Sequence, residues 1–270
     1  MMPTTISFIN VKGGVGKTTI AFNLSHALKI LDRRVLLVDL DLQENLTDRA
    51  VANPKEVKRT VYDLIVRDDT MPLDCIYDTV IKDVQIIPSE IEVVRVKKEM
   101  DPASDPEILF RLRDKLDILR HMFDYVLIDL HPDIDILTTM ALMASSHYII
   151  PVKPDTDSIK GLKITDEYAS KLAKANKQLR ELGILITDFD KRTSIANTFR
   201  ESLLKMFGPR VMDTIIGRNA AITTAAAERQ TIFQYDLRQS GCAAFRSLAR
   251  EVIAKCEGVE VETDGQKEAV

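Results

Sequence analysis

Short runs of aliphatic residues alternate along this chain with longer segments that carry apolar residues at helical spacing. Most of the short runs lack polar alternation, as expected for parallel strands that are covered on both faces. The predicted strands are residues 6–10, 35–39, 84–88, 125–129, 148–152 and 184–187. The predicted helices are residues 18–31, 105–121, 159–179, 194–207 and 242–256. This repetition predicts an α/β fold, a doubly wound and mostly parallel sheet with helices on both faces.

The composition fits one folded domain followed by a short polar end. The chain has 270 residues, of which 45% are hydrophobic and 29% charged, which excludes collagen-like and wholly disordered classes. No linker rich in Pro, Gly or Ser divides it, so residues 1–256 are predicted to form a single domain. Residues 257–270 contain five acidic residues and one lysine, which predicts an acidic, disordered tail.

The charge and the cysteines suggest where the protein works. The net charge is -4, yet residues 191–255 contain eleven Lys and Arg against five Asp and Glu. A basic segment in an acidic protein is expected where one face follows a phosphate backbone.

The three cysteines match no metal or disulfide pattern, and no apolar run is long enough to span a membrane. We therefore expect a cytoplasmic protein.

The segment after the first predicted strand has the composition of a phosphate-binding loop. Residues 11–19 read VKGGVGKTT. The glycines let backbone N–H groups surround an anion, Lys17 can reach the terminal phosphates, and Thr18 can bind Mg²⁺ through its hydroxyl. The strict GxxxxGK[ST] pattern requires glycine at position 11, where this chain has Val11, and the variant loop carries a second lysine, Lys12.

Carboxylates at the ends of two further strands complete the predicted site. Asp39 and Asp41 end one buried run, and Asp129 ends another. Ligands of doubly wound sheets bind at the carboxyl ends of the strands, and carboxylates there can hold Mg²⁺ or its water shell. Together with the loop they predict a Mg²⁺-ATP site, with Thr18, Asp39 and Asp129 as the metal residues.

The chain resembles the ParA/Soj partition ATPases, which belong to the deviant Walker A group with MinD and nitrogenase iron protein. The resemblance covers residues 7 to about 256, in the blocks KGGVGKTT, VDLDLQENLT, FDYVLID, IIPVKPDTDSIKGL, ILITDFDKRT and IIGRNAAITTA. It implies a P-loop NTPase that forms an ATP sandwich homodimer. Lys12 would reach the partner's phosphates, Asp41 would orient the attacking water, and Asp129 would be the Walker B acid. The implied nucleotide-binding residues are Gly13, Gly14, Val15, Gly16, Lys17, Thr18, Thr19, Thr187, Arg218 and Asn219.

The same resemblance implies non-specific binding to double-stranded DNA, nucleoid association, and a ParB-like or cargo-adaptor protein that stimulates hydrolysis. With the basic segment, it makes Arg200, Lys205, Arg218 and Arg246 the candidate DNA-binding residues. The chain departs from the family pattern in three places: it has DLQEN for DPQGN, DLHP for DTPP, and GRNAA where many relatives have a proline and a second arginine. His131, within DLHP, is a candidate catalytic or metal-binding group, but with no second His or Cys nearby in the sequence we favour a local substitution in the loop.

Three other classes of protein are less consistent with the sequence. A MinD-like ATPase that binds membranes needs a basic amphipathic end, whereas this chain ends in GVEVETDGQKEAV, so we expect no membrane partner. A nitrogenase-type electron carrier needs cluster-binding cysteines near the nucleotide motifs, which Cys75, Cys242 and Cys256 do not supply. A regulatory module that only binds nucleotide is disfavoured by Lys12, Lys17, Thr18 and Asp41. Composition and motifs leave open which cargo the protein would move.

Overall fold

The structure is a computed structural model that describes residues 3–155 and 157–258. The described residues form an eight-stranded sheet of order β3-β4-β2-β5-β1-β6-β7-β8. The strands are β1 (Thr4–Phe8), β2 (Val35–Asp39), β3 (Tyr77–Asp78), β4 (Val84–Ile87), β5 (Tyr125–Asp129), β6 (His147–Val152), β7 (Arg180–Phe189) and β8 (Val211–Gly217). All neighbouring pairs are parallel except β3 and β4. The predicted fold class is confirmed.

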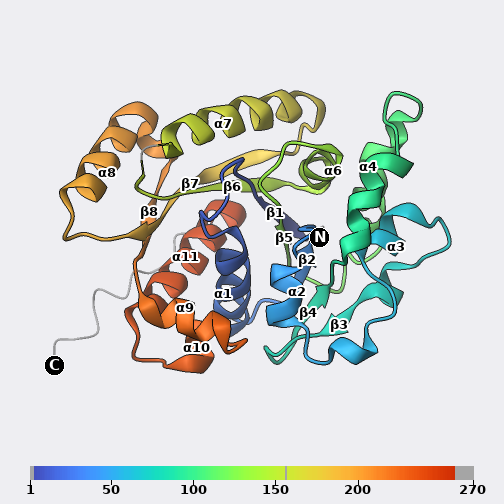
Figure 1. The fold of residues 1–270 in the computed structure, drawn as a ribbon, viewed down its shortest axis with the longest axis horizontal. Coiled ribbons are helices and arrows are strands. Elements are labelled where there is room, and N and C mark those ends of the chain that lie inside the picture. Colours follow the sequence, from blue (N-terminus) through green and yellow to red (C-terminus); the bar gives the residue numbers. More distant parts are fainter. Residues whose placement is uncertain (1–2, 156, 259–270) are drawn as a thin grey trace.

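Helices cover both faces of the sheet (Figure 1). They are α1 (Lys17–Ile30), α2 (Asn45–Ala50), α3 (Val61–Val66), α4 (Val96–Glu99), α5 (Arg111–Asp117), α6 (Ile136–Ala144), α7 (Ser158–Ala175), α8 (Ser194–Phe207), α9 (Ala220–Ala227), α10 (Ile232–Tyr235) and α11 (Ser240–Glu257). Short 3-10 turns occur at Pro54–Glu56, Pro72–Cys75, Ile91–Arg95, Pro106–Phe110 and Gly208–Arg210. None of these described helices is long and apolar enough to cross a membrane.

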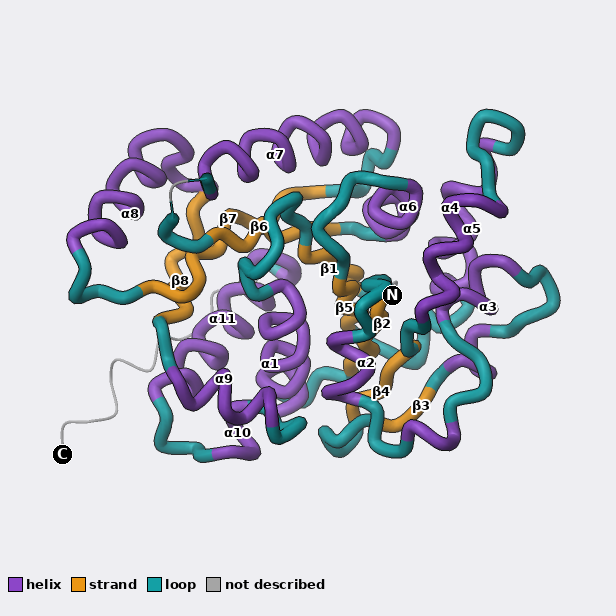
Figure 2. Tube along the Cα trace, in the orientation of Figure 1, coloured by secondary structure: helices purple, strands orange, loops and turns teal. Residues whose placement is uncertain are grey.

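The two helical layers enclose separate hydrophobic cores. Helices α3 to α8 pack on one face, where side chains such as Leu162 and Phe199 join the strand residues Ile128 and Ile150. Helices α1, α2, α9, α10 and α11 pack on the other face, and Figure 2 shows both layers with the strands between them. Successive strand residues contribute to opposite cores, which explains why these strands read as continuous apolar runs.

The structure corrects two expectations about secondary structure. Residues 105–121 form the 3-10 turn Pro106–Phe110 followed by the short helix α5, rather than one helix. Pro106 occupies the first position of the turn, and Asp105 caps it by accepting from the amide of Glu107. Strand β8 was not predicted, because its exposed residues interrupt the apolar pattern at the edge of the sheet. The predicted disordered tail comprises residues 257–270. Of these, Glu257 is the last residue of α11 and Gly258 is its C-cap. Residues 259–270 lie outside the described part of the chain.

The parallel strands bring the predicted chemical groups to one edge of the sheet. β1 leads into the phosphate loop, and its neighbour β5 ends in Asp129. β2 pairs with the other side of β5, so that Asp39 and Asp129 are register partners. Because the carboxyl ends of these strands coincide, segments more than a hundred residues apart in sequence meet beside the start of α1.

Candidate functional site

The phosphate loop leaves the amino-terminal end of α1 open to an anion. Gly14 and Gly16 have φ values of 70° and 90°, in the left-handed region that favours glycine. Gly16 is the N-cap of α1 and no side chain caps the helix. The first N–H groups of an α-helix have no partner inside the helix, and together they carry partial positive charge. This arrangement is typical of a phosphate site.

Buried polar side chains hold the loop in place. Asn10 accepts a hydrogen bond from the amide of Lys12 (2.8 Å) and donates to the carbonyl of Pro151 on β6 (2.7 Å). The hydroxyl of Thr165 on α7 accepts from the amide of Val11 (3.1 Å). The sequence analysis missed both Asn10 and Thr165. Asn10 could have been noticed as a polar residue just before the loop, whereas nothing in the local sequence marks Thr165.

Lys17 lies inside the site rather than on its surface. It is 6% exposed, and its ammonium donates to the carbonyl of Asn10 (3.1 Å). Burial lowers the pKa of Lys17, while the charges of Asp129 and Asp41 oppose this shift. A buried ammonium held by a single carbonyl and facing two carboxylates is well placed to bind terminal phosphates.

Asp39 and Asp129 are fully buried side by side, but their hydrogen bonding differs. Asp39 accepts hydrogen bonds from the amide of Asp41 (2.9 Å) and from the amide and hydroxyl of Thr47 (both 2.8 Å). Neither oxygen of Asp129 has a hydrogen bond of normal geometry to any described residue. Burial raises the pKa of both carboxyls. The proximity of Asp129 raises that of Asp39 further, whereas the Thr18 hydroxyl and the charge of Lys17 oppose the rise at Asp129.

A buried carboxylate without a partner is costly unless a cation satisfies it. Asp129, with Thr18 near it, therefore fits a bound Mg²⁺ ion, which prefers oxygen ligands. Asp39 fits less well as a direct ligand because its oxygens are already occupied by protein donors. Its position favours a structural role, in which it fixes Thr47 and the loop that starts at Asp41.

That loop holds Asp41 against the phosphate site. Asp41 is 7% exposed, and it accepts a hydrogen bond from the amide of Gln43 (2.9 Å). Glu44, the N-cap of α2, has a φ of 55°, a conformation that costs a residue with a Cβ about 1–2 kcal/mol. The DLQEN departure from the family pattern thus places a strained glutamate three residues after Asp41.

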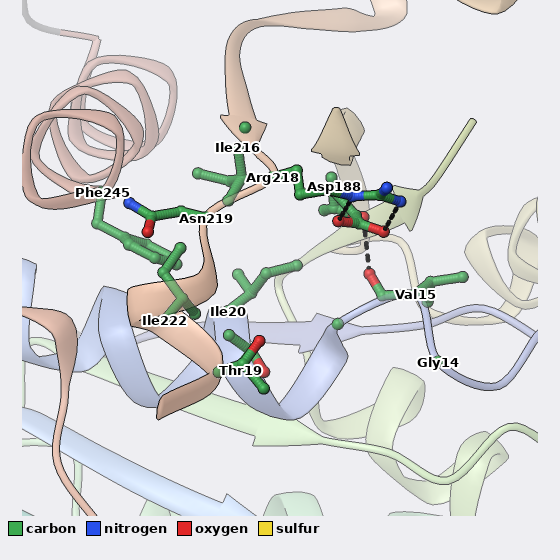
Figure 3. Close-up of a pocket in the computed structure, with 14 residues that line it drawn as sticks. Gly14, Val15, Thr19, Ile20, Asp188, Ile216, Arg218, Asn219, Ile222 and Phe245 are labelled. Carbon is green, nitrogen blue, oxygen red and sulfur yellow. Dashed lines mark hydrogen bonds and ion pairs between the residues drawn. The ribbon is translucent and has the colours of Figure 1, made fainter. Parts of the chain in front are cut away.

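A cavity of about 260 Å³ extends from the phosphate loop toward β8. Figure 3 shows Gly14, Val15, Thr19 and Ile20 on one side of it and residues of β8, α9 and α11 on the other. Its lining residues are Gly14, Val15, Gly16, Thr19, Ile20, Thr187, Asp188, Ile216, Gly217, Arg218, Asn219, Ile222, Thr223 and Phe245. The mixture of an apolar wall with a few polar groups suits a purine base attached to phosphates.

Three predicted nucleotide residues from outside the loop line this cavity. The hydroxyl of Thr187 lies 2.9 Å from the carbonyl of Val15 and fixes the loop to β7. Arg218 forms a bidentate pair with Asp188, with N···O distances of 2.9 and 3.0 Å (Figure 3). Asn219 caps α9 by accepting from the amide of Ala221 (2.9 Å).

The candidate DNA-binding residues do not share one surface. Arg200 and Lys205 are exposed on α8, which packs on one face of the sheet. Arg246 is on α11, on the opposite face, and its guanidinium carbon lies 5.4 Å from the ring centre of Phe233. Arg218 directly follows β8 and lines the cavity beside the phosphate loop. Of the four, only Arg200 and Lys205 occur together on one element.

His131, in the loop after β5, contacts Asp135, which caps α6 and also pairs with a residue of α4. Its Nε2 lies 2.7 Å from an oxygen of Asp135, which also pairs with Lys97 on α4. The partners of Asp135 outweigh its burial and hold its pKa at about 2. The pairing shows what Nε2 of His131 contacts, whereas the interpretation of His131 as a local substitution stays a prediction.

Comparisons with known proteins agree with this geometry. A protein-family profile described as "AAA domain" matches residues 3–182. The sporulation initiation inhibitor protein Soj of Bacillus subtilis is 34% identical over 254 residues, which cover 94% of this chain and 99% of Soj. The chain belongs to the ParA/Soj family of P-loop ATPases. The chromosome partitioning protein ParA of Caulobacter vibrioides is 30% identical over 253 residues, 93% of this chain and 94% of that protein.

Solved structures of related P-loop proteins share the fold of this ParA/Soj relative. Cobyrinic acid a,c-diamide synthase from Mycobacterium smegmatis, with bound ADP and magnesium, superimposes with a TM-score of 0.82 at 25% identity, over 97% of this chain and 99% of that one. The cell division ATPase MinD of Pyrococcus furiosus gives a TM-score of 0.75 at 26% identity, over 93% and 98% of the two chains. The Mg-ADP complex of MinD from Pyrococcus horikoshii gives 0.73 at 28% identity, over 97% and 100%.

Proposed function

We propose that this protein is an Mg²⁺-dependent ATPase that dimerises with ATP, binds DNA without sequence preference, and positions DNA or a protein cargo. The observation that carries the proposal is Lys12, a second lysine in a phosphate loop that Lys17 already serves from within the chain. Lys12 is paired with Asp155 rather than with a group of the phosphate loop, and it would reach a second subunit once that pair opens. The likeness to Soj and ParA supports the same reading.

The residues of the site suit the hydrolysis of ATP. The amides of the loop and Lys17 would bind the phosphates, and Mg²⁺ held by Thr18 and Asp129 would neutralise part of their charge. Asp41 would orient the water that attacks the γ-phosphorus, whose bond to the bridging oxygen breaks to release ADP and phosphate. Phosphoryl transfer needs this kind of positioning and electrostatic stabilisation more than covalent chemistry.

The DNA and partner functions rest on charge and on the family. Arg200 and Lys205 on α8 would contribute to a surface that follows phosphates, and a dimer would present it twice. A ParB-like or cargo-adaptor protein would stimulate hydrolysis, which would release the dimer from DNA. We propose a cytoplasmic, nucleoid-associated protein.

One experiment separates this proposal from its alternatives. The ATPase rate of the purified chain is measured with and without random-sequence DNA, alongside the molar mass by light scattering with ADP and with ATP. A mass that doubles only with ATP, together with DNA binding only by that species, supports the proposal. Nucleotide binding without turnover would favour a regulatory module, and turnover without DNA binding would favour a MinD-like positioning ATPase.

A further inference from the structure

The guanidinium of Arg49 lies half-buried beside the first turn of α1. Arg49 is on α2, and its Nη1 donates a hydrogen bond to the hydroxyl of Thr19 (3.3 Å). Among the residues that the structure describes, no carboxylate forms an ion pair with it. Burial lowers the pKa of Arg49, and the charge of Asp129 opposes this shift. Cations withdrawn from water are normally paired, whereas the carboxylate of Asp129 acts on Arg49 as a nearby charge without forming an ion pair.

The surroundings of Arg49 indicate where that counter-charge would come from. Thr19 lines the cavity beside the phosphate loop, and Figure 3 shows it on the α1 wall. The positive charge of Arg49 lowers the pKa of Asp129, so the guanidinium is also within electrostatic reach of that buried carboxylate. An arginine has five N–H donors, and Arg49 uses one of them on a described residue. Among the described residues that line the cavity, Thr19 is the one that Arg49 contacts, so Thr19 connects Arg49 to that wall.

We propose that Arg49 is a positioning residue for the nucleotide, which holds the hydroxyl of Thr19 at the cavity wall and supplies positive charge to the phosphate next to the ribose. This inference rests on the proposed function, because it needs a nucleotide in the cavity. Thr19 follows Thr18 and lies on the side of the loop that faces the base. The phosphate next to the ribose is common to ADP and ATP, so Arg49 stabilises both nucleotides and leaves the hydrolysis step unchanged.

The position of Arg49 also joins α2 to the wall of the cavity. α2 begins at Asn45, four residues after Asp41, and its other contacts to the site run through Thr47 and Asp39. The pair of Arg49 and Thr19 is therefore a direct side-chain link between α2 and α1 at the cavity. Nothing in the local sequence signals this link, since an arginine in a short polar helix is ordinarily a solvated residue.

Calorimetric titration of Arg49→Gln with Mg-ADP and with a non-hydrolysable Mg-ATP analogue tests the inference. We expect both affinities to fall by about tenfold, the scale of removing one charge-assisted hydrogen bond. The KM for ATP should rise while kcat at saturating ATP stays the same, and Arg49→Lys should recover part of the affinity because it keeps the charge. If Arg49 acts through the hydroxyl of Thr19, its removal should cost less affinity in a Thr19→Val background than in the wild type.

Matched variants keep the outcomes distinct. Arg113→Gln removes an exposed arginine of α5 that pairs with Asp114, and it should leave both affinities unchanged. Unchanged affinities in Arg49→Gln would overturn the inference. A loss of affinity for the ATP analogue alone would also overturn it, because Arg49 would then act on the terminal phosphate. If Arg49→Gln does not fold, Arg49→Lys decides: a loss of affinity smaller than about tenfold in the folded lysine variant supports the charge role, and a loss of about tenfold or more overturns it. A wild-type chain that binds neither nucleotide would instead refute the proposed function.

Discussion

The ammonium of Lys12 is paired with the carboxylate of Asp155 in the same chain. Asp155 also accepts a hydrogen bond from the hydroxyl of Ser158 (2.8 Å), at the start of α7. The bond from Lys12 and the other donors hold the pKa of Asp155 below its usual value, although burial acts in the opposite direction. The second lysine of the phosphate loop is therefore occupied within its own subunit, and this pair must open before Lys12 can reach a partner.

Breaking this pair should favour the dimer. In Asp155→Asn the ammonium of Lys12 loses its anionic partner, and we expect half-maximal dimerisation at an ATP concentration up to about fivefold lower. The effect is modest because the side chains are 23% and 29% exposed, and such pairs contribute about 0–1 kcal/mol. Light scattering across an ATP titration measures it, with Asp157→Asn as the control. A dimer that needs more ATP would show that Asp155 supports the assembly instead.

Removing the carboxylate of Asp41 should separate binding from turnover. Asp41→Ala should bind ATP and dimerise, because Lys17, Thr18 and Asp129 remain, while kcat falls by about 10²–10⁴-fold. Steady-state turnover and titration with a fluorescent ATP analogue measure the two properties. Asp48→Ala, an exposed acid of α2, should leave both unchanged. Loss of ATP binding in Asp41→Ala would make Asp41 a structural or metal-binding residue.

The conformation of Glu44 should be measurable as strain. Glu44→Gly and Glu44→Ala both remove the carboxylate, so they differ only in whether a Cβ is present at a φ of 55°. We expect the glycine variant to be the more stable by about 1 kcal/mol in its free energy of unfolding, because glycine adopts this region without steric cost. Urea denaturation of the two variants gives the difference. Equal stabilities would mean that the loop relaxes when the side chain is shortened.

The parts of the site predicted from the sequence are those that the local chain determines. The glycines at positions 14 and 16, Lys17 and the strand-end acids Asp39 and Asp129 belong to short motifs whose geometry follows from the strand and helix around them. Parallel pairing then brings the strand ends to one edge of the sheet. For these residues the sequence carries most of the information.

The residues that the sequence did not reveal act through contacts between distant segments. Thr165 meets the loop across 154 positions, and Arg49 meets Thr19 across 30. Asp39 illustrates a second limit, since it was predicted beside Asp129 as a metal residue, whereas only the structure reveals that Thr47 already occupies one of its oxygens. The fold around the two strand-end carboxylates, rather than their sequence motif, determines which of them remains without a protein hydrogen-bond donor.

The pKa of His26 should make stability depend on pH. Nδ1 of its ring lies 2.6 Å from the Thr231 hydroxyl, and burial, followed by the charge of Lys29, lowers its pKa to about 4. In the unfolded chain the ring of His26 is protonated near pH 6.5, whereas in the folded chain it is protonated only near pH 4. The contribution of His26 to the free energy of unfolding is therefore complete above pH 6.5 and is lost as the pH falls toward 4. His26→Gln should reduce the fall in Tm over that range, whereas the exposed-site variant His121→Gln should not. Because burial also lowers the pKa of His147, some pH dependence should remain. An unchanged pH profile of Tm in His26→Gln would contradict this role.

The arrangement of the basic residues narrows the expected DNA surface to α8. Arg200 and Lys205 are exposed there, whereas Arg246 packs over Phe233 on the opposite layer and Arg218 is engaged by Asp188. Replacing Arg200 and Lys205 together by alanine should weaken binding to all DNA sequences alike. It should also reduce the steepness of the plot of log K against log salt concentration by about 1.8, because each phosphate that the variant no longer neutralises accounts for about 0.9. Arg246→Ala is the matched control and should leave the slope unchanged. Fluorescence anisotropy with ATP, at several salt concentrations, measures these slopes. If Arg246→Ala lowers the slope and the α8 variant does not, the DNA surface lies on the α11 side of the sheet.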